Sequence, residues 1–250
     1  MILNRILVEA NALYVFGNAT SNYVMNLGDD DYLEDDYLKK VVSLLDSHSN
    51  LGCIIPNFYG ITPRPEKRIL LERDKNAPIY RNAGYEACLA VAHKGHQLSG
   101  LVFYREGLLE EYKKRGVHNI YPFIFMVAYT CLHYDVYHMS DSHTLVTKVP
   151  QNKKDWGYGE DGLMNEIFDN YKRLGLGIWE RANLECRFLE NNAWRYLMYK
   201  KRSKIVKATL KILFAPNLSF LGRFLVFRLI YRQYYYPELK NAIRKRMGKC

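Results

Sequence analysis

The feature of this chain that most constrains its fold is a short apolar segment that ends in three adjacent carboxylates. Tyr23 to Leu27 predict a largely buried strand bounded by Gly28, and Asp29, Asp30 and Asp31 follow at once. Adjacent acids repel one another unless a cation or hydrogen-bond donors neutralise them. Ligands of open α/β sheets bind at the carboxyl ends of strands, and carboxylates are typical ligands of Mg²⁺ or Mn²⁺ beside phosphates. The pattern therefore favours a metal-diphosphate site.

A solvated acidic turn before a helix is the structural alternative for this triplet. Residues 32–45 predict a helix, and the helix dipole favours acids in a first turn. That effect would account for Glu34, Asp35 and Asp36. It explains Asp29 to Asp31 less well, because they lie where the strand ends. We therefore prefer the metal-diphosphate interpretation.

Strand-like and helix-like segments alternate through the first 145 residues, which is typical of an α/β layer fold. Further strands are expected at 51–59, 97–105 and, as an extended return segment, 136–149; helices are expected at 80–93, 106–114 and 123–133. A polar loop then leads into a helix near 163–174, and the chain is expected to be mostly helical from 178 onward. We therefore predict an α/β core over residues 1–150 and a loop and helical region over 151–250.

The basic character of the chain is concentrated at its carboxyl end. Net charge is +10, and residues 195–250 hold 15 of the 36 Lys and Arg but only Glu238 of the 26 acids. Apolar stretches at 208–216 and 220–231 are shorter than the about 18 residues of a spanning helix. Basic, aromatic-rich helices can instead lie on an anionic membrane surface. The alternative is that they pack on the main domain with only their polar face basic.

The cysteines and the amino terminus indicate the cellular compartment of the protein, and the sequence motifs indicate whether it binds nucleic acid. The five cysteines are scattered, odd in number and form no CxxC pair, which favours reduced thiols. The amino terminus lacks the apolar stretch of a signal peptide. We therefore expect a cytoplasmic protein, peripheral on the inner face of the plasma membrane. Nucleic acid is not expected as a partner, since no helix-turn-helix, zinc-finger or RNP pattern accompanies the charge.

The run from Tyr23 to Leu33, followed by a helix and an Ile-Ile-Pro strand, resembles family 2 glycosyltransferases of the GT-A fold. It looks most like the bacterial enzymes that build O-antigen and capsular polysaccharides. The resemblance covers roughly residues 15–135. It implies a GT-A-like, partly Rossmann-like mixed sheet with helices, which the basic helical region follows. It also implies a sugar transfer, inverting at the anomeric carbon, from a nucleotide sugar to a hydroxyl of a polyprenyl-diphosphate-linked glycan.

The same resemblance assigns roles to individual residues. Asp29 and Asp31 occupy the ends of the family's DxD element, which holds Mn²⁺ or Mg²⁺ and the donor diphosphate, and Asp30 occupies its middle. Asp31 would be the first metal contact, with Asp29 nearer the ribose or the sugar. The segment Leu98 to Val102 resembles the acceptor-side strand, where Gly100 would let the sugar approach the backbone.

The general base is less clearly marked. Inverting members carry a Glu-Asp pair at a helix start after the acceptor strand, but Val117 to Pro122 contain no acid at that place. Glu160 and Asp161 precede a predicted helix in a Gly-rich aromatic loop, and Asp161 is our first candidate to deprotonate the acceptor hydroxyl. Ordinary helix capping is the alternative for this pair. His118 is a second candidate base.

Members of the family bind the nucleobase with βαβ units that precede the DxD strand, whereas 28 residues precede Asp29 here. Residues Ile2 to Ala19 can supply one helix, so we expect the first strands to be absent. This expectation keeps a second hypothesis open, a truncated, non-catalytic GT-A fragment that binds a membrane or a partner protein. A basic nucleic-acid-binding module is the third and least favoured hypothesis.

Overall fold

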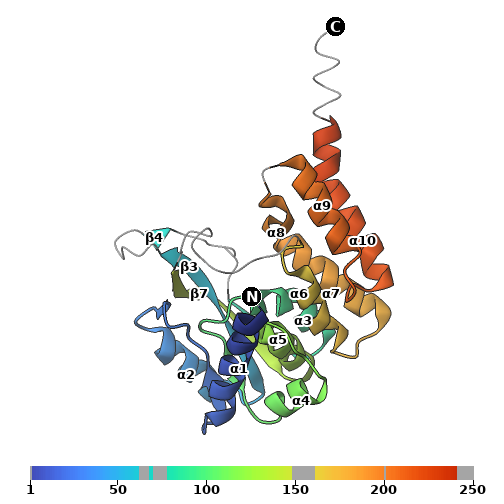
Figure 1. The fold of residues 1–250 in the computed structure, drawn as a ribbon. Coiled ribbons are helices and arrows are strands. Elements are labelled where there is room, and N and C mark those ends of the chain that lie inside the picture. Colours follow the sequence, from blue (N-terminus) through green and yellow to red (C-terminus); the bar gives the residue numbers. More distant parts are fainter. Residues whose placement is uncertain (1, 62–67, 70–77, 148–160, 200, 241–250) are drawn as a thin grey trace. The chain divides into compact units, whose positions relative to one another are not determined.

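The computed structural model describes residues 2–61, 68–69, 78–147, 161–199 and 201–240. The chain divides into two compact units, Met1–Gly157 and Tyr158–Cys250 (Figure 1). The predicted division between residues 150 and 151 falls outside the described residues. The first unit holds the sheet, and the described residues of the second form helices and their connections.

The first unit is built on a mixed sheet. Its described strands are β1 (Tyr23–Met25), β2 (Tyr32–Leu33), β3 (Leu51–Ile61), β4 (Arg68–Ile69), β5 (Ile79–Arg81), β6 (Val102–Tyr104) and β7 (Asp135–Thr147). The order is β1-β6-β3-β7-β2, with β4 paired to β3 and β5 paired to β7. The β3–β7 pair is parallel, and the other described pairs are antiparallel. This arrangement confirms the predicted mixed α/β sheet.

The long central pair of strands carries an irregularity that separates its two halves. Pro56 of β3 is paired with Met139 of β7, whereas the next residue, Asn57, is paired with His143. Three residues of β7 are therefore extra at this point, as in a β-bulge. The inner half of β3 is apolar and buried because helices and neighbouring strands cover it. The outer half of the partner strand β7 carries His143 and Thr147, two polar residues of the candidate site.

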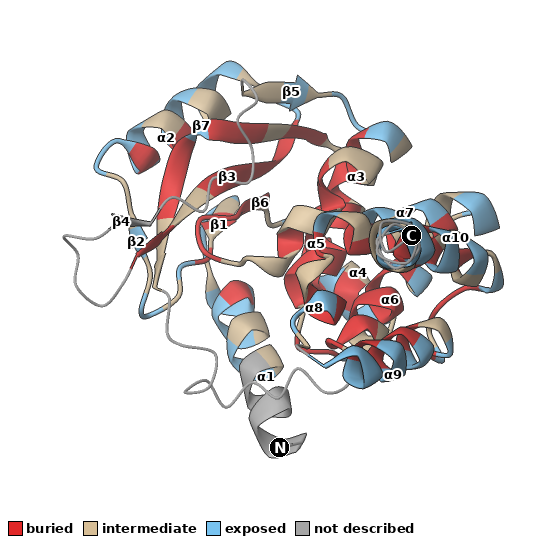
Figure 2. Cartoon of the chain, turned by 90° about the horizontal axis from the view of Figure 1, so that it is seen from above, coloured by how far each residue is buried: buried red, intermediate tan, exposed pale blue. Residues whose placement is uncertain are grey.

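Helices complete the first unit: α1 (Ile2–Asn18), α2 (Tyr37–Ser47), α3 (Tyr85–Val91), the 3₁₀ helix η1 (Ala92–His96), α4 (Leu108–Lys114) and α5 (Pro122–His133). Helix α5 is apolar on all sides and buried along most of its length, as expected for a helix inside a core. Figure 2 shows this burial for α5 and for β3 and β7. The predicted helix at 123–133 and the single amino-terminal helix are confirmed.

Several predicted elements differ from the structure at their ends, among them the strand expected at 23–27, which ends at Met25. The helix expected at 32–45 begins only at Tyr37, because Tyr32 and Leu33 pair with β7 as a strand. The helix expected from residue 80 begins at Tyr85, because Ile79–Arg81 also pairs with β7. The strand expected at 97–105 is shortened to Val102–Tyr104. Pairing with the distant strand β7 therefore shortened both predicted helices at their starts. Apolar periodicity within a segment does not predict such pairing.

The second unit consists of α6 (Met164–Lys172), α7 (Ile178–Asn191), α8 (Trp194–Leu197), α9 (Arg202–Leu213), α10 (Phe220–Ile230) and the π-helical turn η3 (Tyr231–Tyr235). Helix α10 packs mainly on α7. The mostly helical carboxyl-terminal region is therefore confirmed. Among the described residues, none of the helices is both long enough and apolar enough to cross a bilayer.

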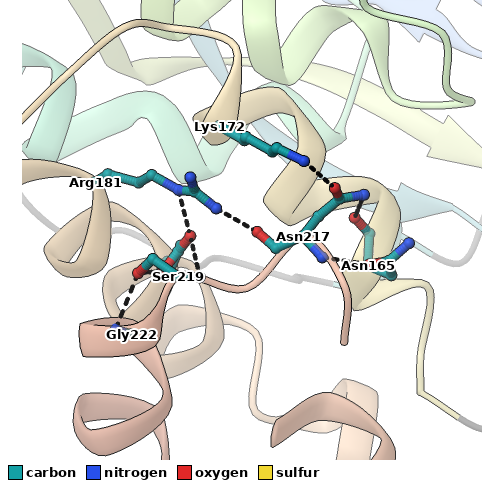
Figure 3. Close-up of polar contacts among 7 residues, drawn as sticks. Asn165, Lys172, Arg181, Asn217, Ser219 and Gly222 are labelled. Atoms are coloured by element: carbon teal, nitrogen blue, oxygen red, sulfur yellow. Dashed lines mark hydrogen bonds and ion pairs between the residues drawn. The ribbon is translucent and has the colours of Figure 1, made fainter. Parts of the chain in front are cut away.

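A buried polar cluster fixes the start of α10 on α7 (Figure 3). Glu185 of α7 is fully buried and accepts hydrogen bonds from the backbone N–H and the hydroxyl of Ser219, at 3.1 and 2.5 Å. Arg181 pairs with Glu185 at 2.8 Å and donates to the Asn217 carbonyl at 2.5 Å. The Ser219 hydroxyl also accepts from Gly222 N–H at 2.9 Å and so caps α10. Burial raises the pKa of the Glu185 carboxyl despite these donors.

Candidate functional site

Asp31 ties together three segments that lie far apart in the sequence. Its Oδ2 accepts a hydrogen bond from the Ser99 hydroxyl at 2.5 Å, and its Oδ1 accepts from Thr147 N–H at 2.9 Å. The Ser99 oxygen accepts in turn from Gly28 N–H at 3.0 Å. The turn after β1, the turn before β6 and the end of β7 are thus joined at one carboxylate. We call these four residues, Gly28, Asp31, Ser99 and Thr147, the Asp31 latch.

The other two acids of the triplet face solvent. Asp29 and Asp30 are exposed and lie in a turn, whereas Asp31 is half-buried. Thr147 also donates through its hydroxyl to the backbone carbonyl of Asp30, so the turn is held at the end of β7. The triplet is therefore displayed at a sheet edge with one fixed carboxylate and two accessible ones.

This arrangement can be tested for its fit to a divalent cation. Within the described part of the chain, three or more His, Cys, Asp or Glu side chains do not gather into a metal-binding group. Mg²⁺, however, usually takes one or two protein carboxylates and completes its octahedron with water and substrate phosphates. Asp29 and Asp31 can supply such a ligand pair, since a carboxylate oxygen can bind a metal ion while it also accepts a hydrogen bond. The donor set fits a metal shared with a diphosphate.

Gly100 is required by the packing of the sheet. Its φ of +83° lies in the left-handed region, and a Cβ there would lie 2.2 Å from Thr144 Cγ2 and 2.9 Å from Pro56 Cγ. Its N–H donates to the Asn26 carbonyl at 2.7 Å, and its carbonyl accepts from the Tyr37 hydroxyl at 2.5 Å. Gly100 is itself buried. Contact between a sugar and this backbone stays a prediction.

A second polar group lies on the outer half of β7. Glu34 Oε2 accepts from His143 N–H at 2.9 Å and lies 3.4 Å from His143 Nδ1. The Tyr59 ring stacks on the imidazole with centroids 3.9 Å apart. His143 Nε2 is buried, and no atom of the described residues hydrogen-bonds to it. A carboxylate beside an imidazole is one part of a general-base arrangement; the other part, access of a substrate to Nε2, is closed by the burial of that atom.

The predicted base Asp161 caps a helix. Its Oδ1 accepts from Leu163 N–H at 3.1 Å and its Oδ2 from Asn165 N–H at 3.4 Å, at the start of α6. These contacts are those of the capping alternative. Glu160 lies outside the described residues. His118, the second candidate base, has a 79% exposed side chain 3.5 Å from Glu9 Oε1.

Several residues of the site were not singled out from the sequence. Ser99 and Thr147 became visible only through their contacts with Asp31, because nothing in their local sequence marks them. Asn26 gave a weak signal as a polar residue in an apolar strand, and it is 8% exposed with Nδ2 unpaired among the described residues. His143 had no signal, since it is one polar residue in a long mixed strand.

The described cysteines are free thiols. Cys53, Cys88 and Cys131 are buried in the first unit, and Cys186 is half-buried in α7. Burial raises the pKa of the Cys53 and Cys131 thiols, and it raises the pKa of Cys186 to about 11. Thiols with raised pKa values are poor nucleophiles, so we assign the cysteines no catalytic role.

Comparisons with known proteins identify the fold. No family model matches the chain, and no curated protein matches it either. Among solved structures, the chain is similar to Staphylococcus aureus TarS 1–349 in complex with UDP-GlcNAc, with a TM-score of 0.54 and 14% identity over 88% of this chain and 70% of that one. The chain has a glycosyltransferase-like fold. The predicted fold class is thereby confirmed, whereas membership of the O-antigen branch of family 2 stays a prediction.

Proposed function

We propose that this protein transfers a sugar from a nucleotide-sugar donor to a hydroxyl of a lipid-linked glycan, with inversion, in cell-surface polysaccharide synthesis. The observation that carries the proposal is the Asp31 latch, which holds an acidic triplet at a sheet edge in a glycosyltransferase-like fold. The similar TarS structure contains UDP-GlcNAc, which supports a nucleotide sugar as donor. The polyprenyl-diphosphate acceptor rests on the family resemblance.

In this proposal the acidic triplet binds the donor diphosphate through a divalent ion. Asp29 and Asp31 would hold Mn²⁺ or Mg²⁺, which supplies charge neutralisation for the diphosphate leaving group. Ser99 and Thr147 keep the Asp31 carboxylate in one orientation, so this side chain loses little conformational freedom when the ion binds. Asp30 and Gly100 are the proposed donor contacts beside this pair.

Two residues are proposed as alternatives for the general base. Asp161 is the candidate from the sequence, and its carboxylate already accepts two backbone hydrogen bonds. His143 is the candidate from the structure, because Glu34 orients it; its buried Nε2 would accept the proton once donor binding opens the site to the acceptor. Comparing Asp161→Asn with His143→Gln separates them, since the variant that lacks the base loses turnover while it still binds donor.

The decisive experiment measures nucleotide-sugar turnover with Mn²⁺. We expect the wild-type chain to release nucleoside diphosphate from at least one common nucleotide sugar, and Asp31→Asn to lower that rate about 100-fold or more. Asp46→Asn is the matched control, because Asp46 is an exposed acid on neighbouring α2. Equal activity of Asp31→Asn and wild type would overturn the metal assignment.

One observation favours a second candidate, a non-catalytic GT-A-like protein that binds a membrane or a partner. Helix α5 begins at Pro122 without an acid, and the Asn119 side chain accepts from Tyr121 N–H where the family places its base. Donor binding without turnover, measured by calorimetry with nucleotide sugars and Mn²⁺, would establish this candidate in place of the enzyme.

A further inference from the structure

Helix α10 exposes a stripe of aromatic side chains. Phe220, Phe224, Phe227 and Tyr231 are 69, 59, 54 and 43% exposed. Their spacing of four, three and four residues places them on one face of the helix. Val226, Leu229 and Ile230 are buried on other faces of the same helix, where it packs on α7. Helix α10 thus has an apolar inner face and an equally apolar outer face.

The neighbouring helix continues this apolar exposure. Val206 and Leu210 of α9 and Phe214, which follows its last residue, recur every four residues and are 36, 50 and 70% exposed. Scattered exposed apolar residues are ordinary, but an exposed apolar stripe on each of two packed helices is typical of an interaction surface. These exposed side chains therefore favour an interaction surface on the second unit.

Cations accompany these apolar side chains. The geometry of an ideal helix places Arg223 on one side of the α10 stripe and Arg228 on the other, and Arg232 follows one turn later. Helix α9 adds exposed Arg202, Lys204, Lys207 and Lys211. From residue 195 to residue 237 the sequence contains no acid. The surface is therefore both aromatic and strongly positive.

We infer that the outer face of α10 and the start of η3, formed by Phe220, Phe224, Phe227 and Tyr231 with Arg228 and Arg232, docks on an anionic lipid bilayer. Aromatic and aliphatic side chains would enter the boundary between headgroups and acyl chains, while the long arginines reach back to lipid phosphates. We call this surface the aromatic-basic face. It requires no spanning helix, and it does not depend on the proposed sugar transfer.

The charge of the face argues for lipid over a second copy of the chain. Two such faces brought together would place like charges opposite one another, which disfavours self-association. Nucleic acid would satisfy the cations but would leave a row of phenylalanines on a helix largely in water. An anionic bilayer satisfies both, because its surface attracts Lys and Arg and its interior accepts the rings.

The experiment measures sedimentation of the full chain with vesicles of phosphatidylcholine, with or without phosphatidylglycerol. We expect binding to the anionic vesicles and weak binding to the neutral ones, with added salt lowering the first. The double variant Phe224→Ser with Phe227→Ser should weaken partitioning about tenfold or more, since two rings no longer leave water. The control Ile178→Ser with Trp179→Ser removes two exposed side chains of α7, 58 and 64% exposed, and should bind like wild type.

A second pair of variants tests the charges separately. Arg228→Glu with Arg232→Glu should weaken binding about tenfold or more, whereas Lys39→Glu with Lys113→Glu, the same charge change on exposed residues of the first unit, should not. Circular dichroism and thermal unfolding confirm that each variant is folded. Equal binding by test and control variants would overturn the proposal. So would binding to random duplex DNA in place of vesicles, or an oligomer that the Phe224 and Phe227 substitutions dissociate.

Discussion

Asp31 in the first unit and Glu185 in the second are held by the same kinds of donor. Each accepts a hydrogen bond from a serine hydroxyl at 2.5 Å and another from a backbone N–H near 3 Å. Their surroundings differ. Glu185 is fully buried and pairs with Arg181, whereas Asp31 is half-buried beside exposed Asp29 and Asp30.

The difference shows that the same kinds of hydrogen bond can have two different roles. Around Glu185 the donors and a cation satisfy a carboxylate that water does not reach, so the group joins two helices. Around Asp31 similar donors orient a carboxylate that remains next to solvent and to two further acids. Burial therefore separates a structural carboxylate from one that is available to a ligand.

The largest expected effect is a loss of stability when Glu185, the buried carboxylate of this comparison, is removed. Glu185→Ala should lower the free energy of unfolding by about 3 kcal/mol or more, because it leaves Arg181 and the start of α10 without their partner. Urea unfolding followed by circular dichroism measures the loss. Glu190→Ala, on a partly exposed residue of the same helix that pairs with exposed Arg187, is the control and should change stability little. A loss no larger than that of the control would remove the distinction drawn here.

The two serines sharpen the comparison. Ser99→Ala and Ser219→Ala should each lower stability by about 1–2 kcal/mol, since each removes a buried hydroxyl that both donates and accepts. Only Ser99→Ala should also weaken Mn²⁺ binding and turnover, about tenfold or more, because it frees Asp31 to rotate. Calorimetric titration with Mn²⁺ measures the difference. Equal metal affinity in the two variants would show that the Asp31 latch is purely structural.

The smallest expected effect concerns pH. Because the folded protein raises the pKa of Glu185, the folded state binds the proton more tightly than the unfolded state. The contribution of Glu185 to stability therefore falls as pH rises from 4.5, its ordinary value, through its higher folded value. Subtracting the unfolding free energies of Glu185→Gln from those of wild type isolates this residue from the other carboxyls. A difference that is flat or grows with pH would contradict the direction stated here.

Parts of the fold followed from local sequence alone. The strand before Asp29 and the buried helix at 123–133 were predicted because their apolar patterns are strong over short windows. The prediction that the strand reaches Leu27 and is largely buried was wrong, since β1 ends at Met25 and Leu27 is 44% exposed. The first turn of the helix expected at 32–45 was wrong, since β7, more than a hundred residues away, captures Tyr32 and Leu33 as a strand. Local patterns report what a segment prefers, and distant partners can override that preference.

The residues of the candidate site also fall into those that the sequence predicted and those that only the folded structure identified. The acidic triplet was recognisable because three adjacent carboxylates at a strand end are unusual in themselves. Ser99, Thr147 and His143 were not, because common residue types gain a role only from what folding places beside them. For Asp161 the sequence left two roles open, general base and helix cap. Only the hydrogen bonds of the folded chain show that it caps α6.

By itself the sequence determined the chemistry that this protein can carry, namely an acidic triplet after a strand and a basic, aromatic carboxyl-terminal region. These properties belong to the residues themselves, so they hold even where the predicted ends of helices and strands are wrong. Only the tertiary structure decided which carboxylate is held, which faces water, and which side of α10 stays exposed. Those outcomes depend on contacts between residues such as Asp31 and Thr147 that are distant in the chain. Chain folding creates such contacts, and no local pattern encodes them.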